Sequence, residues 1–316
     1  MTGRIQVAVV GGGRSVEHDV SLASAASIAG ALDPDAYEVV RLRIDPEGEW
    51  HRDQPLGLAG AVQVLGACDV VVPALHGPHG EDGTLAALCE LVGVPYVGSG
   101  VGAGALAMDK WATKLVAEEV GIRTARGRLM TRRSPVTFEG PCVVKPVRAG
   151  SSHGVSLVRT ARELPDALAA AFAVDDRVLV EEVVVGREID VAVLGRADGA
   201  RVVAPALEIV TDGVFDLATK YDGSADFRVP ASLATSEREA LERAAVAAYD
   251  ALGCRGVARV DFFLTADGPV LNEVNTMPGF TEQSQVPRMF AAAGTSYAAL
   301  LDLLVRDALA PSMMAA

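Results

Sequence analysis

Short runs rich in Val and Ile alternate along the first third of the chain with longer runs rich in Ala and Leu. The former predict buried strands, and the latter predict helices with an apolar face. The pattern places strands at residues 4–11, Tyr37–Ile44, Asp69–Leu75 and Pro95–Val97, and helices at Ser15–Leu32 and Thr84–Val92. This order predicts a βαβ-type open sheet, in which ligands bind at the loops that follow the strands.

The amino-acid composition changes near Gly98-Ser99-Gly100. We place the domains at residues 1–96, 97–185 and 186–316. The middle range predicts helices at Gly102–Met108, Lys110–Val120 and Ala161–Phe172, and strands at Gly127–Met130, Pro141–Pro146 and Arg177–Val184. The last range predicts strands at Glu188–Leu194 and Arg201–Ile209, and helices at Ser236–Leu252 and Tyr297–Leu309. The alternation of strands and helices indicates an α/β protein.

A β-hairpin in the last range carries the most informative chemistry. The runs GVARVDFFL and PVLNEVNT flank a turn at Ala266-Asp267-Gly268. Because side chains alternate along a strand, Arg259 shares a face with Asp261, and Glu273 shares one with Asn275. Carboxylate and amide oxygens suit Mg²⁺ bound together with substrate phosphates, and an Arg beside them suits a developing negative charge. The alternative is a surface hairpin whose charges face water.

Composition narrows the class of protein. Half of the 316 residues are hydrophobic and the net charge is −13, so we expect a large core and no nucleic-acid surface. The four cysteines show no CxxC spacing and sit in apolar runs, which predicts a packing role. The N-terminus reads as a strand rather than a signal peptide, and no apolar run reaches the ~18 residues of a membrane span. We therefore expect a cytoplasmic protein without a membrane partner.

Two glycine-rich loops follow predicted strands in the first range. Gly11-Gly12-Gly13 precedes a helix that begins near Glu17, where a ligand anion could bind or where Glu17 could simply cap the helix. His76 begins the segment HGPHGEDG, at a strand end where it could meet a ligand. The two acids of that segment could instead begin the next helix.

Three further motifs carry charge. Lys145 ends a strand and precedes a Gly/Ser loop that includes Ser151, an arrangement that could hold phosphates, as could Lys110. Acidic residues lie within the apolar strand VLVEEVVVGRE. They could hydrogen-bond to an adenine and a ribose, or they could face water at a sheet edge. The loop DLATKYDG could close over a substrate or be an ordinary surface loop.

These segments together resemble the D-alanine–D-alanine ligase family of the ATP-grasp superfamily. The resemblance runs from about residue 5 to 305, and the order and spacing of its strings are highly specific. The strings are GGRSVEHDVSL, HGPHGEDG, MDK, KPVRAGSSHGV, VEEVVVGRE, TKY, RVDFF and NEVNTMPGFTEQS. The resemblance implies an ATP-grasp fold, with 1–96 as a Rossmann-like substrate-binding domain and 97–185 and 186–316 as the two ATP-grasp subdomains.

The resemblance also implies a reaction and its cofactors. ATP would phosphorylate the carboxylate of one D-alanine, and the amine of a second D-alanine would attack this acyl phosphate. Two Mg²⁺ ions, or Mn²⁺, would accompany ATP, and the product would serve peptidoglycan synthesis. The family often forms homodimers.

The resemblance assigns roles to individual residues. Catalysis falls to Glu17, Ser151, Tyr221, Arg259 and Gly279. The D-alanine substrates would be bound by Glu17, His76 and Ser284. ATP would be bound by Lys110, Lys145, Ser151, Glu181, Val184, Glu188 and Lys220. The metal ligands would be Asp261, Glu273 and Asn275.

The chain departs from the family pattern after Phe280, where Glu282 and Gln285 replace small polar and apolar residues. Both would border the pocket of the second substrate, so a related ligase with D-lactate, D-Ser or another amino acid as acceptor is the alternative. Lys220-Tyr221 in a loop without His matches the dipeptide-forming type. A catalytically silent nucleotide-binding module is disfavoured because the metal ligands and Arg259 are present. A dinucleotide oxidoreductase is disfavoured because the first loop lacks GxGxxG.

Overall fold

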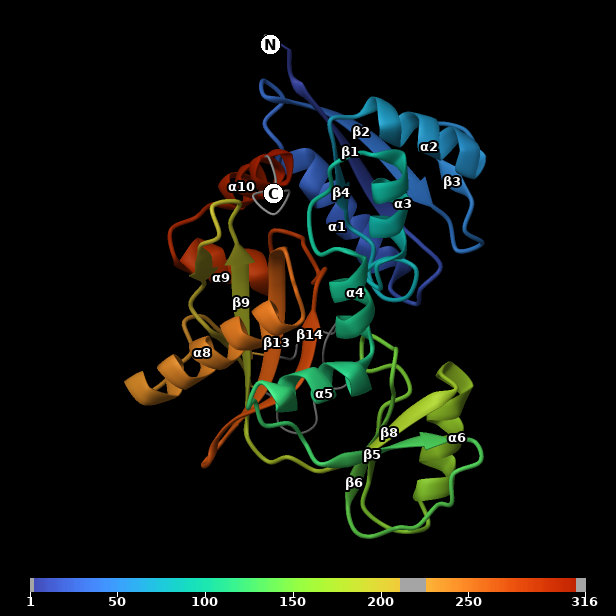
Figure 1. Ribbon diagram of the computed structural model, residues 1–316, viewed down its shortest axis with the longest axis vertical. Coiled ribbons are helices and arrows are strands. Elements are labelled where there is room, and N and C mark those ends of the chain that lie inside the picture. Colours follow the sequence, from blue (N-terminus) through green and yellow to red (C-terminus); the bar gives the residue numbers. More distant parts are fainter. Residues whose placement is uncertain (1–2, 211–225, 311–316) are drawn as a thin grey trace.

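The N-terminal part of the computed structural model is an open sheet with strand order β3-β2-β1-β4 (Figure 1). The structure describes residues 3–210 and 226–310. The strands β1 (Ile5–Gly12), β2 (Tyr37–Ile44) and β4 (Val70–Pro73) are parallel, and β3 (Trp50–His51) is antiparallel to β2. Residues 7–12 of β1 are all buried, which is the continuous apolar pattern of a parallel strand covered on both faces. The helices are α1 (His18–Ala31), α2 (Gly57–Ala67) and α3 (Thr84–Val92).

The middle of the chain forms a smaller antiparallel sheet with strand order β5-β8-β6-β7. Its strands are β5 (Gly127–Thr131), β6 (Cys142–Pro146), β7 (Ser156–Val158) and β8 (Arg177–Glu182). The helix α6 (Leu164–Val174) packs on this sheet through a cluster that includes Leu168 and Phe172. We call this part the β5–β8 unit, which lies at the bottom of Figure 1.

The third sheet has strand order β12-β11-β9-β13-β14, with β10 paired to β9. Its strands are β9 (Arg187–Gly195), β10 (Arg201–Val203), β11 (Leu207–Val210), β12 (Asp226–Arg228), β13 (Gly256–Thr265) and β14 (Gly268–Asn275). The helix α8 (Thr235–Ala251) covers this sheet, and α9 (Gln285–Ala292) and α10 (Tyr297–Leu309) follow it. The central strand β9 is buried continuously from Ile189 to Leu194.

Two helices from the predicted middle range pack against the third sheet. They are α4 (Val101–Met108) and α5 (Lys110–Glu119), and Ala103, Ala107 and Ala117 join its core cluster. Asp109 separates the two helices and caps α5, because its Oδ1 accepts from Ala112 N at 2.9 Å. The backbone N–H of Lys110 donates to Val147 O, so the start of α5 is also tied to the β5–β8 unit.

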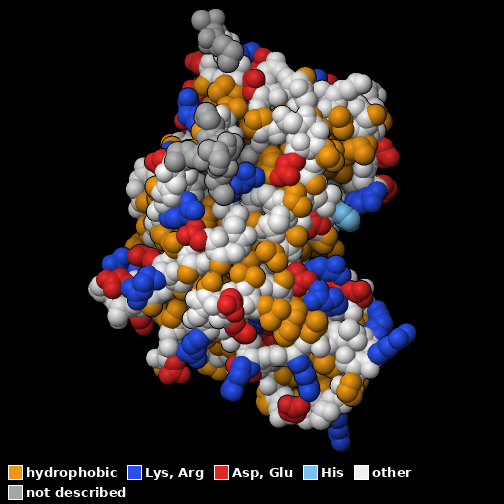
Figure 2. Space-filling model, in the orientation of Figure 1, with side chains coloured by type: hydrophobic (Ala, Val, Ile, Leu, Met, Phe, Trp, Pro, Cys, Tyr) orange, Lys and Arg blue, Asp and Glu red, His pale blue; other side chains and the backbone are white. Residues whose placement is uncertain are grey.

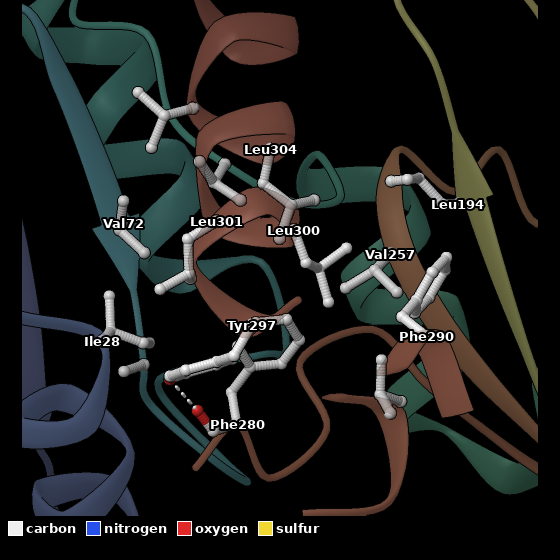
Figure 3. Packing of buried hydrophobic residues seen from close by; sticks show 14 of the residues in the cluster. Ile28, Val72, Leu194, Val257, Phe280, Phe290, Tyr297, Leu300, Leu301 and Leu304 are labelled. Carbon is white, nitrogen blue, oxygen red and sulfur yellow. Dashed lines mark hydrogen bonds between the residues drawn. The ribbon is translucent and has the colours of Figure 1, made fainter. Parts of the chain in front are cut away.

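The largest apolar core joins the two ends of the chain (Figure 3). Leu300, Leu301 and Leu304 of α10 face Ile28 of α1 and Val72 of β4 on one side, and the third sheet on the other. Tyr297 OH donates to Phe280 O at 2.6 Å within this cluster. The N-terminal sheet and the third sheet therefore share a core, which fixes the loop that leads to Phe280.

Most predicted elements are present, with local differences. The strand predicted over Arg201–Ile209 is two strands, since Pro205 lies in the break and has no N–H for a ladder. Pro95–Val97 is no strand, and only a single bridge joins Tyr96 to Val71. The helices predicted to begin at Ser15 and Ala161 begin at His18 and Leu164. The sequence reasoning missed α2, α9, β3, β7 and β12.

Two expectations from composition also have a structural outcome. Cys68, Cys89, Cys142 and Cys254 are buried and free, which fits the packing role. Within the residues that the structure describes, no single helix has the length and apolar character to cross a membrane; α9 and α10 would pass only as a pair bent by 103°.

We expect Leu300→Ala to lower the free energy of unfolding by about 2–5 kcal/mol, because Leu300 is fully buried in the shared core and the substitution leaves a cavity. Leu91→Ala is the matched control, since Leu91 in α3 is 87% exposed and should change stability by less than about 0.5 kcal/mol. Urea unfolding followed by circular dichroism measures both, and equal losses would contradict the role given to the α10 core.

Candidate active site

The hairpin of β13 and β14 presents the predicted charged face. Arg259 lies opposite Asn275, and Asp261 lies opposite Glu273. The register then shifts, because Phe262 pairs with Leu271 and leaves Asn272 unopposed. This bulge turns the consecutive residues Asn272 and Glu273 toward one cavity, and bulges commonly re-aim side chains beside active sites.

Arg259 is buried between carboxylates. Its Nε and Nη2 donate to Asp261 at 2.7 and 2.8 Å, and its Nε lies 3.4 Å from Asp190 Oδ2. Asp190 stands opposite Asp261 across β9 and β13, so two like charges are adjacent and Arg259 compensates them. Burial opposes the charge of Arg259, but Asp261 and Asp190 outweigh it and raise its pKa. The guanidinium is thus charged and fixed in position.

Lysines line the other side. Lys145 Nζ lies 2.7 Å from Glu181 Oε2 and donates to Asn272 Oδ1 at 3.2 Å. Lys110 Nζ donates to Ala149 O at 2.7 Å and lies 3.1 Å from Glu273 Oε2. Lys110 and Lys145 therefore reach from the β5–β8 side to the hairpin.

A second lysine meets Glu181. Lys114 Nζ lies 2.7 Å from Glu181 Oε1. Burial opposes the charge of Glu181, but Lys145 and Lys114 outweigh it and lower its pKa. Burial also lowers the pKa of Lys114, against the pull of Glu181.

Glu17 contacts a loop far away in the sequence. Ser151 Oγ donates to Glu17 Oε1, and Glu17 makes no side-chain cap to α1. The capping alternative for Glu17 is therefore wrong. Ser151 and Ser152 have φ values of 49° and 56°, a left-handed turn that brings Gly150 against the Glu17 carboxylate.

His76 is held from both ring nitrogens. Nδ1 lies 2.8 Å from Met277 O, and because a carbonyl only accepts, Nδ1 carries the proton. Nε2 then accepts from Ser24 Oγ at 3.1 Å, and Ser24 Oγ accepts from Phe280 N at 3.1 Å. Burial lowers the pKa of His76, against the effect of Met277 and Glu17. His76 thus fastens the loop after β14 to α1.

A cavity of about 340 Å³ lies between the β5–β8 unit and the third sheet. Nine of the predicted site residues line it: Lys110, Lys145, Ser151, Glu181, Val184, Glu188, Arg259, Asp261 and Glu273. Glu17 and Asn275 join them through hydrogen bonds, to Ser151 and to Asp261 Oδ2 at 3.0 Å. Lys220 and Tyr221 lie outside the described residues.

The remaining predicted residues border the site without lining the cavity. His76 acts through the loop described above, and Gly279 lies in that loop with its Cα facing Ser284 Oγ. Ser284 Oγ accepts from Thr281 N at 3.0 Å at the start of α9. Of the two departures from the family pattern, Gln285 lines the cavity, and Glu282 is exposed outside it.

Sequence reasoning missed several site residues. Lys114 lies four positions after Lys110 on α5, a helical spacing that could have placed both on one face. Asn272 reaches the cavity only because of the bulge, which the sequence does not show, and Asp190 lies within an apolar strand that gives no sign of a site.

Glu81 also lies near these charged groups. Burial and the carboxylates of Glu17 and Glu273 raise the pKa of Glu81 to about 8, so its carboxyl is mostly protonated at neutral pH.

The donor set of the hairpin fits Mg²⁺ better than a metal held by protein alone. Asp261, Glu273 and Asn275 offer hard oxygens, and Mg²⁺ commonly takes one or two carboxylates together with substrate phosphates. Among the described residues, no group of three His, Cys, Asp or Glu side chains is placed to hold a metal ion. Substrate phosphates and water would supply the other ligands of such an ion.

Family models match both halves of the chain. The D-ala D-ala ligase N-terminus matches residues 6–63 and 55–99, and the D-ala D-ala ligase C-terminus matches residues 122–306. The chain belongs to the D-alanine–D-alanine ligase family.

Relatives and solved structures agree with this membership. A D-alanine–D-alanine ligase of Mycolicibacterium smegmatis is 42% identical over 98% of this chain and 96% of its own length. The VanG D-Ala:D-Ser ligase of Enterococcus faecalis is 33% identical, with a TM-score of 0.85 over 97% of this chain and 100% of that one. The Bacillus anthracis ligase complexed with ATP is 29% identical, with a TM-score of 0.82 over 96% of this chain and 97% of that one. The predicted family and ATP-grasp fold are confirmed.

We expect His76 of this ligase-family protein to stay neutral below its ordinary pKa of about 6.5, because it is buried and both ring nitrogens are engaged. As the pH falls, the His76 imidazole is protonated in the unfolded chain before it is protonated in the folded protein. His76 therefore makes the free energy of unfolding fall as the pH drops below about 6.5. Nitrogen-15 NMR of the imidazole measures the pKa, with His76→Gln to assign the signal. Titration at or above 6.5 would contradict the network.

Proposed function

We propose that this chain joins two D-alanines into D-alanyl-D-alanine, with ATP as the source of energy. The observation that carries the proposal is the meeting of Lys110 and Lys145 with the Arg259, Asp261 and Glu273 face in one cavity. Cations on one wall and hard oxygens on the other suit a nucleotide phosphate chain with its metal. The relatives named D-alanine–D-alanine ligase support the same reaction.

The nucleotide occupies this cavity in the proposal. Glu181 accepts a hydrogen bond from the adenine amino group beside Val184, and Glu188 accepts one from a ribose hydroxyl. Glu181 Oε1 is buried and lies 2.7 Å from the Lys114 ammonium, so the carboxylate is held in one orientation at the cavity wall. A carboxylate oxygen has more than one lone pair, so one held there suits an incoming N–H donor. Lys110 and Lys145 hold the phosphates, covered by the loop of Ser151, with Lys220 as a further contact.

Two Mg²⁺ ions, or Mn²⁺, would be held by Asp261, Glu273 and Asn275, and would neutralise phosphate charge when bound. In this chain the Asp261 carboxylate is oriented by Arg259 and by the Asn275 amide, and the Glu273 carboxylate by Lys110. These contacts keep the donor oxygens at the cavity wall.

Bond formation follows from positioning and charge. A carboxylate oxygen of the first D-alanine attacks the terminal phosphorus, and ADP leaves. The amine of the second D-alanine attacks the acyl phosphate, and the tetrahedral intermediate expels phosphate and loses a proton. Arg259 and the N–H of Gly279 stabilise its oxyanion, a role that demands donors fixed before reaction. The network of Arg259 with Asp261 and Asp190 supplies that rigidity.

The substrates sit at the junction of the three parts of the chain. Glu17 holds the ammonium of the first D-alanine, and its contact with Ser151 ties this subsite to the phosphate loop. His76 orders the same subsite through Met277, and Ser284 holds the carboxylate of the second substrate. Tyr221 completes closure of the loop.

Gln285 supports an alternative in which the second substrate is not D-alanine. Its Oε1 accepts from Arg259 Nη1 at 2.5 Å, so a polar amide borders the cavity beside the proposed oxyanion group. One similar structure is a D-Ala:D-Ser ligase, whose acceptor carries a hydroxyl. A D-Ala–D-Ser or D-Ala–D-lactate product would follow if this amide selects a polar acceptor.

The proposal extends to a cytoplasmic homodimer that supplies peptidoglycan precursors and binds no nucleic acid. The net charge of −13 supports the last point. On the face seen in Figure 2, Lys and Arg side chains are interspersed with Asp and Glu.

We expect phosphate release from Mg-ATP with D-alanine alone, and mass spectrometry should identify D-alanyl-D-alanine. D-Ser and D-lactate are added in parallel reactions. Turnover only with one of those acceptors would establish the alternative, and ATP hydrolysis without any ligated product would overturn both readings.

We expect Arg259→Ala to lower kcat by roughly 10²–10³, because it removes charge stabilisation that acts in the transition state. Arg259→Lys is the matched variant: it keeps the charge beside Asp190 and Asp261 but loses the planar fork, so its loss should be smaller. Steady-state kinetics with both substrates measures this effect. An unchanged kcat with a raised KM would show that Arg259 only binds substrate.

A further inference from the structure

Lysine is rare in this chain, and the three lysines that the structure describes lie at one place. Of 28 basic residues only four are lysines, at positions 110, 114, 145 and 220, so 24 are arginines. All 24 arginines lie in the described part of the chain, and only Arg259 among them is buried. Lys114 and Lys145 are buried, and the Lys110 side chain is 11% exposed. The three described lysines thus stand where charge is removed from water.

Lys114 stands behind the cavity rather than in its wall. It lies on α5, between the third sheet and the β5–β8 unit (Figure 1), and its side chain is 4% exposed. Its Nζ contacts Glu181 Oε1 at 2.7 Å and donates to Ala125 O at 3.0 Å. Glu181 and Lys145 line the cavity, but Lys114 does not. Lys114 therefore makes no direct contact with a molecule that fills the cavity.

The charges of this cluster are unequal. Glu181 is a single carboxylate between two ammonium groups, Lys114 at one oxygen and Lys145 at the other, both at 2.7 Å. The three side chains together carry one net positive charge. Without Lys114, the Glu181 carboxylate would cancel the charge of Lys145 at close range, in a buried setting where such interactions are strong. Lys145 also donates to Asn272 Oδ1, and this amide is neutral.

We propose that Lys114 is a positioning residue that balances Glu181 from behind, so that the positive charge of Lys145 is available to nucleotide phosphates. The inference rests on the proposed function, in which a nucleotide occupies this cavity. In this inference Glu181 has two tasks. It binds the adenine, and it holds the Lys145 side chain in position. Lys114 makes the two tasks compatible, because it removes the cost of placing a carboxylate beside a phosphate-binding lysine.

The test separates phosphate binding from adenine binding. Isothermal titration calorimetry measures the Kd of ADP and of adenosine, both with Mg²⁺. The ratio of the adenosine Kd to the ADP Kd reports what the phosphates contribute to affinity. In Lys114→Met we expect ADP affinity to fall on the order of tenfold, as loss of one nearby charge implies, with adenosine affinity little changed. In Lys114→Met/Glu181→Gln the cluster regains one net positive charge, so the ratio should return toward that of the unaltered protein. Lys114→Arg, which keeps the charge, should also retain the ratio.

Controls separate the failure of this inference from the failure of the proposed function. Arg243→Met removes one positive charge from an exposed side chain on α8 and should leave both affinities unchanged. If the unaltered protein binds neither ADP nor adenosine, the nucleotide site itself is wrong. If it binds both, and Lys114→Met weakens ADP and adenosine equally or not at all, Lys114 does not act through charge. If Lys114→Met does not fold, the ratio in the charge-restored double variant and in Lys114→Arg decides the question, and a ratio lowered tenfold in both would overturn the inference.

Discussion

Every charge that leaves water in this protein needs a counter-charge, and this constraint organises the site. Arg259 is buried only because Asp190 and Asp261 surround it, and Glu181 is buried only because Lys114 and Lys145 do the same. Burial of an unpaired ion would cost several kcal/mol, whereas paired groups can be retained at modest cost. The pairs also hold each side chain in one orientation, so the cavity has a defined pattern of charge before any substrate enters.

That pattern depends on how the three sheets are held. The shared core around α10 fixes the N-terminal sheet against the third sheet, and the Ser24–His76–Met277 contacts extend this rigidity to the loop after β14. The β5–β8 unit contacts the rest of the chain at the start of α5, through the Arg177–Asp109 ion pair, the Glu17–Ser151 bond and the lysine pairs. Apart from the Arg177–Asp109 pair, these contacts involve residues of the proposed site. The chain thus places several groups of the proposed site at the junctions between its three parts.

Local rules predicted the parts of the site that depend on local geometry. Strand alternation put Arg259 with Asp261, and Glu273 with Asn275, and the observed register agrees. The bulge at Asn272 could not be predicted, because it depends on how β14 meets β13 and not on either strand alone. Glu17 was ambiguous for a related reason: its partner Ser151 is 134 residues away, and only the folded chain shows that it makes no cap. The strand predicted over Arg201–Ile209 is interrupted at Pro205, which has no N–H to donate to a neighbouring strand.

Residue choice held information that periodicity did not. Arginine and lysine carry the same charge, yet the planar guanidinium needs a wide partner, and the ammonium is a compact point charge. This chain uses arginine for forked pairs, as Arg187 with Glu208 at 2.7 and 2.8 Å, and for the proposed oxyanion group. Lys114 and Lys145, by contrast, are two compact cations that approach the single carboxylate of Glu181. A rare residue type that recurs within 35 positions, at Lys110, Lys114 and Lys145, therefore indicates a site built from compact point charges.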